Sequence, residues 1–190
     1  MNWIKIRANK EKEEYFEKRT KEHIDRVINA ANKIIEKFPE FEKIKEKINE
    51  HDSSKLKEPE RTPYIDITWR HKFDNYNSYK QPGKLEKQQE NDATLHHIIN
   101  NEHHPEYWLE DKSKANIDEK DRDKSKECID ATKMPEEALL EMVADWQAMS
   151  EELKKNTARQ WYDSQKDVRW HFSEEQDKTI DKFLKVFEAK

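Results

Sequence analysis

The sequence predicts an all-α protein, a single-domain bundle of helices that spans residues 1–190. Two observations support this prediction. Apolar residues recur at steps of three, four and seven in several long segments, and no segment shows convincing strand alternation of polar and apolar residues. Because 42% of the residues are charged and 33% are hydrophobic, we expect a thin core inside a highly charged surface.

The first helix is predicted from Asn9 to Phe38, and Pro39 ends it because the residue before a proline is pushed out of the helical region. Its inner face is a stripe made of Phe16, His23, Val27, Ile34 and Phe38. A second helix is predicted from Glu40. The apolar stripe of this helix continues into His51, Asp52 and Lys55, so we expect them at the inner face of its C-terminal end.

Further helices follow a polar turn around Pro59. A third helix is predicted to start near Pro63, and residues 75–83 are predicted to form a loop. A fourth helix is expected from Leu85 to Asn101, and a short element follows Pro105.

Residues 110–130 are almost wholly polar and charged, which predicts an exposed loop. A strongly apolar helix opens at Met134-Pro135 and extends to about Leu153. A shorter helix is expected around Trp161. The last helix begins at Ser173-Glu-Glu-Gln176, which has the spacing of a capping box.

Composition excludes several classes of function. The only glycine is Gly83, so the glycine-rich loops that bind nucleotide phosphates are absent. The net charge of −5 without a basic stripe disfavours a nucleic-acid-binding surface. One cysteine excludes an internal disulfide and a cysteine-rich zinc site. The N-terminal segment has no apolar stretch long enough for a signal peptide or a membrane span, so we expect a cytoplasmic protein, with an oligomer left open.

A histidine followed by an aspartate, His51-Asp52, can place an imidazole nitrogen and a carboxylate oxygen on one divalent metal ion. His23 and Asp145 each interrupt an apolar helical face. A buried carboxylate is costly unless it is paired, hydrogen-bonded or bound to a cation, and a metal is an economical partner. Singly, each residue also has an ordinary explanation, since an inward histidine is often a hydrogen-bonded core residue. The combination on separate helices favours a metal site.

Four more histidines, His96, His97, His103 and His104, lie within nine residues. They could form a surface patch, or at least one of them could contact a metal or a substrate. His97 and His104 are seven residues apart and could share a helical face. His103 and His104 could instead project from the loop before Pro105.

Three sequence blocks in this order are similar to the HD-domain superfamily of metal-dependent phosphohydrolases, and in particular to small bacterial and phage members. They are His-Asp-Ser-Ser-Lys (51–55), Asn-Glu-His-His-Pro-Glu-Tyr-Trp (101–108) and Glu-Met-Val-Ala-Asp-Trp (141–146). The resemblance covers about residues 22–162. It implies a helical bundle of the HD-domain type with a metal site between the helices.

The resemblance also implies roles for individual residues. His23, His51, Asp52 and Asp145 would hold one divalent metal, and Asp52 would bridge to a second one. His97 and His104 would be ligands of that second metal, with His103 as the alternative ligand or as a contact to the substrate. Lys55 would bind the substrate phosphate and would act with Asp52 in catalysis.

The expected activity is hydrolysis of a nucleotide or another small phosphate ester by metal-activated water. The cofactor would be one or two ions of Mn, Fe, Co, Ni, Zn or Mg. Two alternatives stay open. Some members of the superfamily hold a di-iron centre and are oxygenases. A helical module without catalytic activity, which binds a partner protein, would carry a structural metal site with a closed coordination shell.

Overall fold

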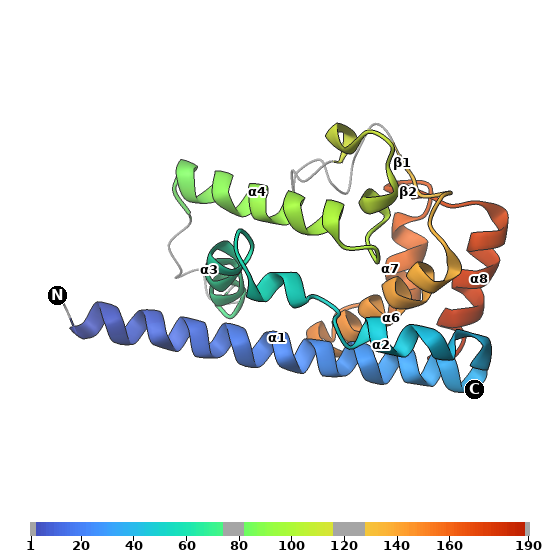
Figure 1. The fold of residues 1–190 in the computed structure, drawn as a ribbon, viewed down its shortest axis with the longest axis horizontal. Helices are drawn as coiled ribbons and strands as arrows, with labels where there is room; N and C mark the ends of the chain where they lie inside the picture. Colours follow the sequence, from blue (N-terminus) through green and yellow to red (C-terminus); the bar gives the residue numbers. More distant parts are fainter. Residues whose placement is uncertain (1–2, 74–81, 116–127, 189–190) are drawn as a thin grey trace. The chain divides into compact units, whose positions relative to one another are not determined.

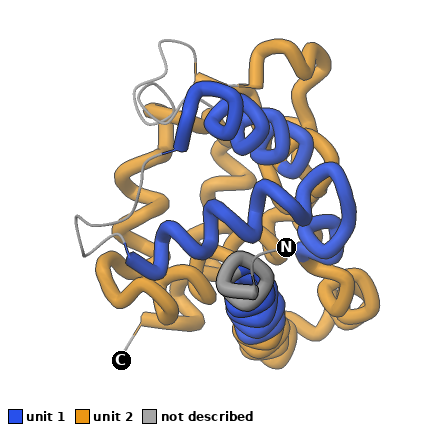
Figure 2. Tube along the Cα trace, turned by 90° about the vertical axis from the view of Figure 1, so that its left-hand side faces the viewer, with its two compact units in different colours: residues 1–22, 52–97 blue, residues 23–51, 98–190 orange. Residues whose placement is uncertain are grey.

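The computed structural model describes residues 3–73, 82–115 and 128–188. Most of these residues are helical, which confirms the all-α class. The chain groups into two compact units, coloured separately in Figure 2. Unit 1 comprises Met1–Glu22 and Asp52–His97, and unit 2 comprises His23–His51 and Ile98–Lys190. The organisation as a single HD-type domain stays a prediction.

Helix α1 (Trp3–Lys37) is one continuous helix that contributes its first part to unit 1 and its second part to unit 2 (Figure 1). It confirms the first predicted helix and starts six residues earlier than Asn9. Four residues of the predicted stripe, from Phe16 to Ile34, are buried. Phe38 leaves the helical region, with φ −132° and ψ 74°, just before Pro39.

The second predicted helix is shorter than expected. The chain forms a 3₁₀ helix, η1 (Pro39–Ile44), a single turn of α-helix, α2 (Lys45–Ile48), and then a separate 3₁₀ helix, η2 (Ser53–Leu56). Phe41, Ile44 and Ile48 are buried as predicted. The prediction that the helix continues through His51 to Lys55 was wrong, because Asp52 adopts φ 57° and ψ 11°, which no right-handed helix can accommodate.

Helices α3 (Arg61–His71) and α4 (Lys84–Asn100) confirm the third and fourth predicted helices, and α4 belongs to unit 1 as far as His97. Unit 1 combines apolar and charged interior contacts. Tyr15 of α1 meets Trp69 of α3 edge to face, with ring centroids 5.7 Å apart. Arg70 of α3 donates to both carboxylate oxygens of Glu90 of α4, at 2.5 and 2.6 Å, and both side chains are largely buried.

The main hydrophobic core lies in unit 2. It is built on α6 (Glu136–Leu153), which packs against α7 (Ala158–Gln165) and α8 (Glu174–Leu184). The predicted capping box at Ser173 and Gln176 is present, and Thr157 with Gln160 forms a second one at the start of α7. Both boxes fix the points where these helices begin.

Two short strands correct the expectation of a chain without strands. β1 (Ile129–Asp130) pairs in parallel with β2 (Trp170–His171), with Ile129 opposite Trp170. Each strand has two residues, too few to show an alternating pattern in the sequence. The element expected after Pro105 is the 3₁₀ helix η3 (Pro105–Trp108), and η4 (Lys112–Lys114) follows it.

The two predicted loops fall largely outside the described residues. Of the loop expected over 75–83, residues 75–81 are not described. Within the charged stretch 110–130, residues 116–127 are not described, whereas η4 and β1 occupy its described ends. Ile129 is buried, so the C-terminal end of this stretch is not a solvated loop. Within the described ranges, no helix has both the length and the apolar character needed to cross a membrane.

Candidate metal centre

The His51-Asp52 pair lies in the turn between α2 and η2. The N–H group of His51 donates to the carbonyl of Ile48, and the N–H group of Lys55 donates to the carbonyl of Asp52, both at 3.0 Å. Asp52 is one of three residues with a positive φ in the described part of the chain. Such a conformation is uncommon for residues other than glycine, and aspartate is one of the residues that adopt it. Both side chains are buried, as predicted, although the turn is not helical.

Unit 2 brings three of the predicted ligands together. Nε2 of His23, on α1, lies 3.1 Å from Oδ1 of Asp145, on α6. Nε2 of His51 lies 3.9 Å from the same oxygen atom. The three residues each offer one ligand atom, and these atoms all lie within 4.8 Å of one another. Two imidazole nitrogens from distant parts of the sequence therefore converge on one carboxylate oxygen.

Glu141 orients the ring of His51 from its other side. It stands one helical turn before Asp145 on α6 and is 3% exposed. Nδ1 of His51 donates to Oε1 of Glu141 at 2.9 Å, because an ionised carboxylate can only accept. Burial raises the pKa of Glu141, but the hydrogen bonds and charges of His103 and His51 outweigh it and leave the pKa well below its ordinary value. Glu141 is thus held as a carboxylate, and Nε2 of His51 is the ring atom that faces Asp145.

Of the four clustered histidines at 96–104, His103 lies in unit 2 next to Glu141 and His51. Its Nδ1 lies 3.3 Å from Oε1 of Glu141, and its ring centroid is 4.3 Å from that of His51. His103 is buried, at 3% exposure, whereas the ring of His104 packs against His103 with centroids 4.2 Å apart. Both residues precede η3 in a non-helical segment, which agrees with the alternative that they project from the loop before Pro105.

Asp145 is held in its ionised form by the surrounding rings. Burial alone would raise its pKa, but the hydrogen bond with His23 and the charges of His23, His51 and His103 lower the pKa to about 2. Its side chain is 17% exposed, so it is partly rather than fully buried. A carboxylate in this position can balance the charge of a bound cation or of a protonated histidine.

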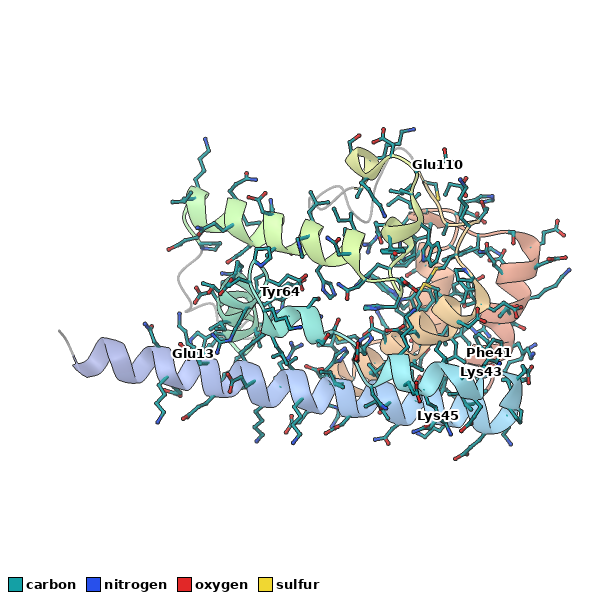
Figure 3. All side chains as sticks on the ribbon, in the orientation of Figure 1. Glu13, Phe41, Lys43, Lys45, Tyr64 and Glu110 are labelled. Carbon is teal, nitrogen blue, oxygen red and sulfur yellow. The ribbon has the colours of Figure 1, made fainter. Side chains whose placement is uncertain are left out.

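Unit 1 holds the remaining predicted residues in a second polar cluster. Oδ2 of Asp52 lies 2.5 Å from Nζ of Lys55, and Oδ1 of Asp52 lies 3.2 Å from Nε2 of His97. Lys55 also lies over the ring of Tyr64, labelled in Figure 3, with its ammonium nitrogen 5.3 Å from the centroid. Glu60, completely buried, accepts a hydrogen bond from Nδ1 of His97 at 2.9 Å. His97 is therefore flanked by two carboxylates.

Sequence analysis missed Glu141 and Glu60, both of which are buried and bound to histidines. Glu141 carried a usable signal, because it precedes Asp145 by four residues and so shares its face of the helix. Glu60 carried none. It lies in a turn that the sequence presents as polar, and its histidine partners are 36 and 37 residues away.

A cavity of about 540 Å³ lies in unit 1, between the start of α3 and the middle of α4. Its lining is strongly acidic and includes Glu58, Asp66, Glu86, Glu90 and Asp92, together with His96. None of the predicted metal ligands is among its lining residues in the described part of unit 1. One residue of the lining, His96, contacts the cluster around Asp52, because its Nδ1 lies 2.7 Å from Oε1 of Glu60.

The donor set of unit 2 fits a divalent metal ion. Imidazole nitrogens and a carboxylate oxygen suit Mn, Fe, Co, Ni or Zn. A carboxylate bound to the opposite nitrogen of a ligand histidine is a recurrent feature of metal sites, and Glu141 supplies it for His51. His23, His51 and Asp145 would hold the ion in unit 2. Asp52, His97 and His104 stay predictions as ligands.

Fold and site define a mostly helical protein with buried histidine and aspartate side chains that could hold a metal ion. The chain belongs to DUF5662, a family of unknown function, whose model matches residues 12–186. No curated protein and no solved structure matches the chain. The resemblance to the HD-domain superfamily stays a prediction.

Proposed function

We propose that the protein is a metal-dependent phosphohydrolase that acts on a nucleotide or another small phosphate ester. The observation that carries the proposal is the convergence of Nε2 of His23 and Nε2 of His51 on Oδ1 of Asp145, at 3.1 and 3.9 Å. A structural core histidine needs hydrogen-bond partners, but two rings from distant segments need not point at one oxygen. A cation held between them gives a reason for this arrangement.

The residues of unit 2 would bind and orient the cation. Glu141 holds the proton on Nδ1 of His51, so that Nε2 keeps its lone pair on the side of Asp145. Asp145, held ionised, would balance positive charge. A divalent ion in this position would lower the pKa of a water molecule toward neutrality and neutralise phosphate oxygens.

The residues of unit 1 would act on the substrate, as the sequence resemblance implies. Lys55 is the candidate for phosphate binding, since its side chain is 22% exposed and its partner Asp52 is buried. In the reaction, the oxygen of water would bond to phosphorus while the bond from phosphorus to the leaving oxygen breaks. The leaving oxygen takes up a proton, and the products are a phosphate and an alcohol, or two phosphates where the leaving group is itself phosphorylated.

The first experiment is elemental analysis of the full chain, purified without a metal-chelating tag, together with Asp145→Ala. Asp163→Ala, which removes an exposed aspartate of α7, is the matched control. We expect a transition metal in the wild type and in the control, and its loss in Asp145→Ala. Wild-type protein that contains no metal and binds no added Mn²⁺ or Co²⁺ would overturn the proposal.

The second experiment tests the reaction itself. Release of inorganic phosphate from nucleoside mono-, di- and triphosphates is measured without oxygen, with Mn²⁺ or Co²⁺ added. Phosphate release by the wild type and the control, but not by Asp145→Ala, supports hydrolysis. Iron as the retained metal, with oxygen consumption and no phosphate release, would replace hydrolysis by the oxygenase alternative.

A further inference from the structure

Glu60 is a completely buried carboxylate that lies just before α3, and its side chain accepts hydrogen bonds from three residues. Oε1 accepts from Nδ1 of His96 at 2.7 Å. Oε2 accepts from Nδ1 of His97 and from the hydroxyl group of Ser54, both at 2.9 Å. A buried carboxylate is tolerated only where such donors replace water. The position of Glu60 is therefore tied to these three side chains.

The contact with Glu60 decides which nitrogen of His97 carries a proton. Both neighbouring carboxylates can only accept, and the contact of Nδ1 with Glu60 at 2.9 Å is shorter than that of Nε2 with Asp52, so it favours a neutral His97 ring with its proton on Nδ1 and its lone pair on Nε2. Nε2 lies 3.2 Å from Oδ1 of Asp52, which is 1% exposed. An imidazole lone pair and a carboxylate oxygen thus face each other, an arrangement that a cation would stabilise.

The same arrangement occurs a second time in the chain. In unit 2, buried Glu141 accepts from Nδ1 of His51, and Nε2 of His51 points toward Asp145. In unit 1, Glu60, His97 and Asp52 repeat these roles with residues from different segments. The repetition argues against a chance contact of a core histidine.

We infer that Glu60 is a positioning residue, which fixes the proton of His97 on Nδ1 and so presents Nε2, together with Oδ1 of Asp52, as a preformed pair of donors for a divalent cation. The inference deepens the proposed function and rests on it for the identity of the ligand. Glu60 itself does not contact the cation, and it acts through His97.

The test is ¹⁵N NMR of the histidine rings in metal-free full-length protein at pH 8, without substrate. The signals of His97 are assigned by their loss in His97→Gln. We expect His97 of the wild type to carry its proton on Nδ1 and not on Nε2. In Glu60→Ala we expect the proton to shift to Nε2, where Oδ1 of Asp52 can accept it. Glu60→Gln keeps a carbonyl acceptor and should retain the wild-type form.

Glu58→Gln is the matched control, because Glu58 is an exposed carboxylate two residues away that accepts from Thr62. It should leave the signals of His97 unchanged. A proton on Nε2 of His97 in the wild type would overturn the inference, and so would an unchanged His97 in a folded Glu60→Ala protein. If Glu60→Ala does not fold, the wild-type spectrum still decides.

A titration with Mn²⁺ separates this inference from the proposed function. Loss of the orienting carboxylate should weaken the Mn²⁺ binding that depends on Asp52 and His97 about 10- to 100-fold in Glu60→Ala, leave the binding at His23, His51 and Asp145 unchanged, and leave both unchanged in Glu58→Gln. Unchanged Mn²⁺ affinity in Glu60→Ala would overturn the link between Glu60 and the cation. A wild type that binds no Mn²⁺ would overturn the proposed function and the link between Glu60 and the cation. The position of the proton on His97 would still establish or refute the role of Glu60 in orienting the ring.

Discussion

Nδ1 of His51 lies 2.9 Å from Oε1 of Glu141. Glu141 stands one helical turn before Asp145 on α6. One helix therefore supplies both the carboxylate that orients the ring and the carboxylate toward which Nε2 of that ring points. The spacing of four residues fixes the two carboxylates on the same face. The metal affinity proposed for unit 2 should thus depend on a residue that is not itself a ligand.

Replacing Glu141 with glutamine should weaken metal binding without removing the three ligands. The amide is uncharged, so its oxygen is a poorer acceptor for Nδ1 of His51, and the ring loses part of its orientation. We expect the affinity for Mn²⁺, measured by calorimetric titration, to fall about 10- to 100-fold. Glu137→Gln, at an exposed position of the same helix, is the control. Wild-type affinity in a folded Glu141→Gln protein would contradict the role of this carboxylate.

Replacing Lys55 with alanine should leave the metal content unchanged and weaken substrate binding. A hydrogen bond to a charged group contributes about 1.5–3 kcal/mol, so we expect KM for the phosphate ester to rise roughly 10- to 100-fold. The readouts are elemental analysis and steady-state kinetics of phosphate release. Lys57→Ala removes an exposed lysine two residues away and should behave as the wild type. An unchanged KM in Lys55→Ala would refute phosphate binding by this residue.

The features that sequence analysis predicted correctly depend on local patterns. The helices α1, α4, α6 and α8 follow from apolar spacing and from capping residues such as Ser173, which act within a few residues of the chain. The inward positions of His23 and Asp145 follow from the same spacing, because each shares a face with core residues. The sequence resemblance implied that both residues hold one metal, and in the structure Nε2 of His23 lies 3.1 Å from Oδ1 of Asp145.

The features that sequence analysis missed depend on contacts between distant segments. The sequence around Glu60 predicts only a polar turn. The contacts that bury this residue come from His96 and His97 in α4, far along the chain. The left-handed conformation of Asp52 interrupts an apolar stripe that predicts a continuous helix. The pairing of β1 with β2 joins residues about forty positions apart over two residues each. No periodicity within a short window reports such contacts.

The buried ion pair between Arg70 and Glu90 should be important for the stability of unit 1. Arg70→Leu leaves the carboxylate of Glu90 buried without its guanidinium, which costs about 3–5 kcal/mol of the free energy of unfolding. The double variant Arg70→Leu/Glu90→Leu should recover most of this loss, since no buried charge remains. Chemical denaturation of the full chain measures both.

Lys10→Leu provides the control for that ion pair. Lys10 and Glu14 form an exposed pair on α1 at 3.6 Å, and its loss should change the free energy of unfolding by about 0–1 kcal/mol. If Arg70→Leu costs no more than this control, the pair between α3 and α4 does not stabilise unit 1. Equal losses in the single and the double variant would point to packing rather than charge.

Deprotonation of the Tyr162 hydroxyl group should lower the stability of the protein at alkaline pH. Burial, and the hydrogen bond that the phenol donates to Asp177 at 2.5 Å, raise the pKa of Tyr162 well above its ordinary value of 10.0. Because the folded pKa exceeds the unfolded one, the phenol stabilises the fold fully below pH 10.0, and this contribution is lost as the pH rises toward the folded value. Urea denaturation above pH 10.0 should show that the free energy of unfolding falls more steeply with pH in the wild type than in Tyr162→Phe. Equal declines would show that deprotonation of Tyr162 is not linked to unfolding.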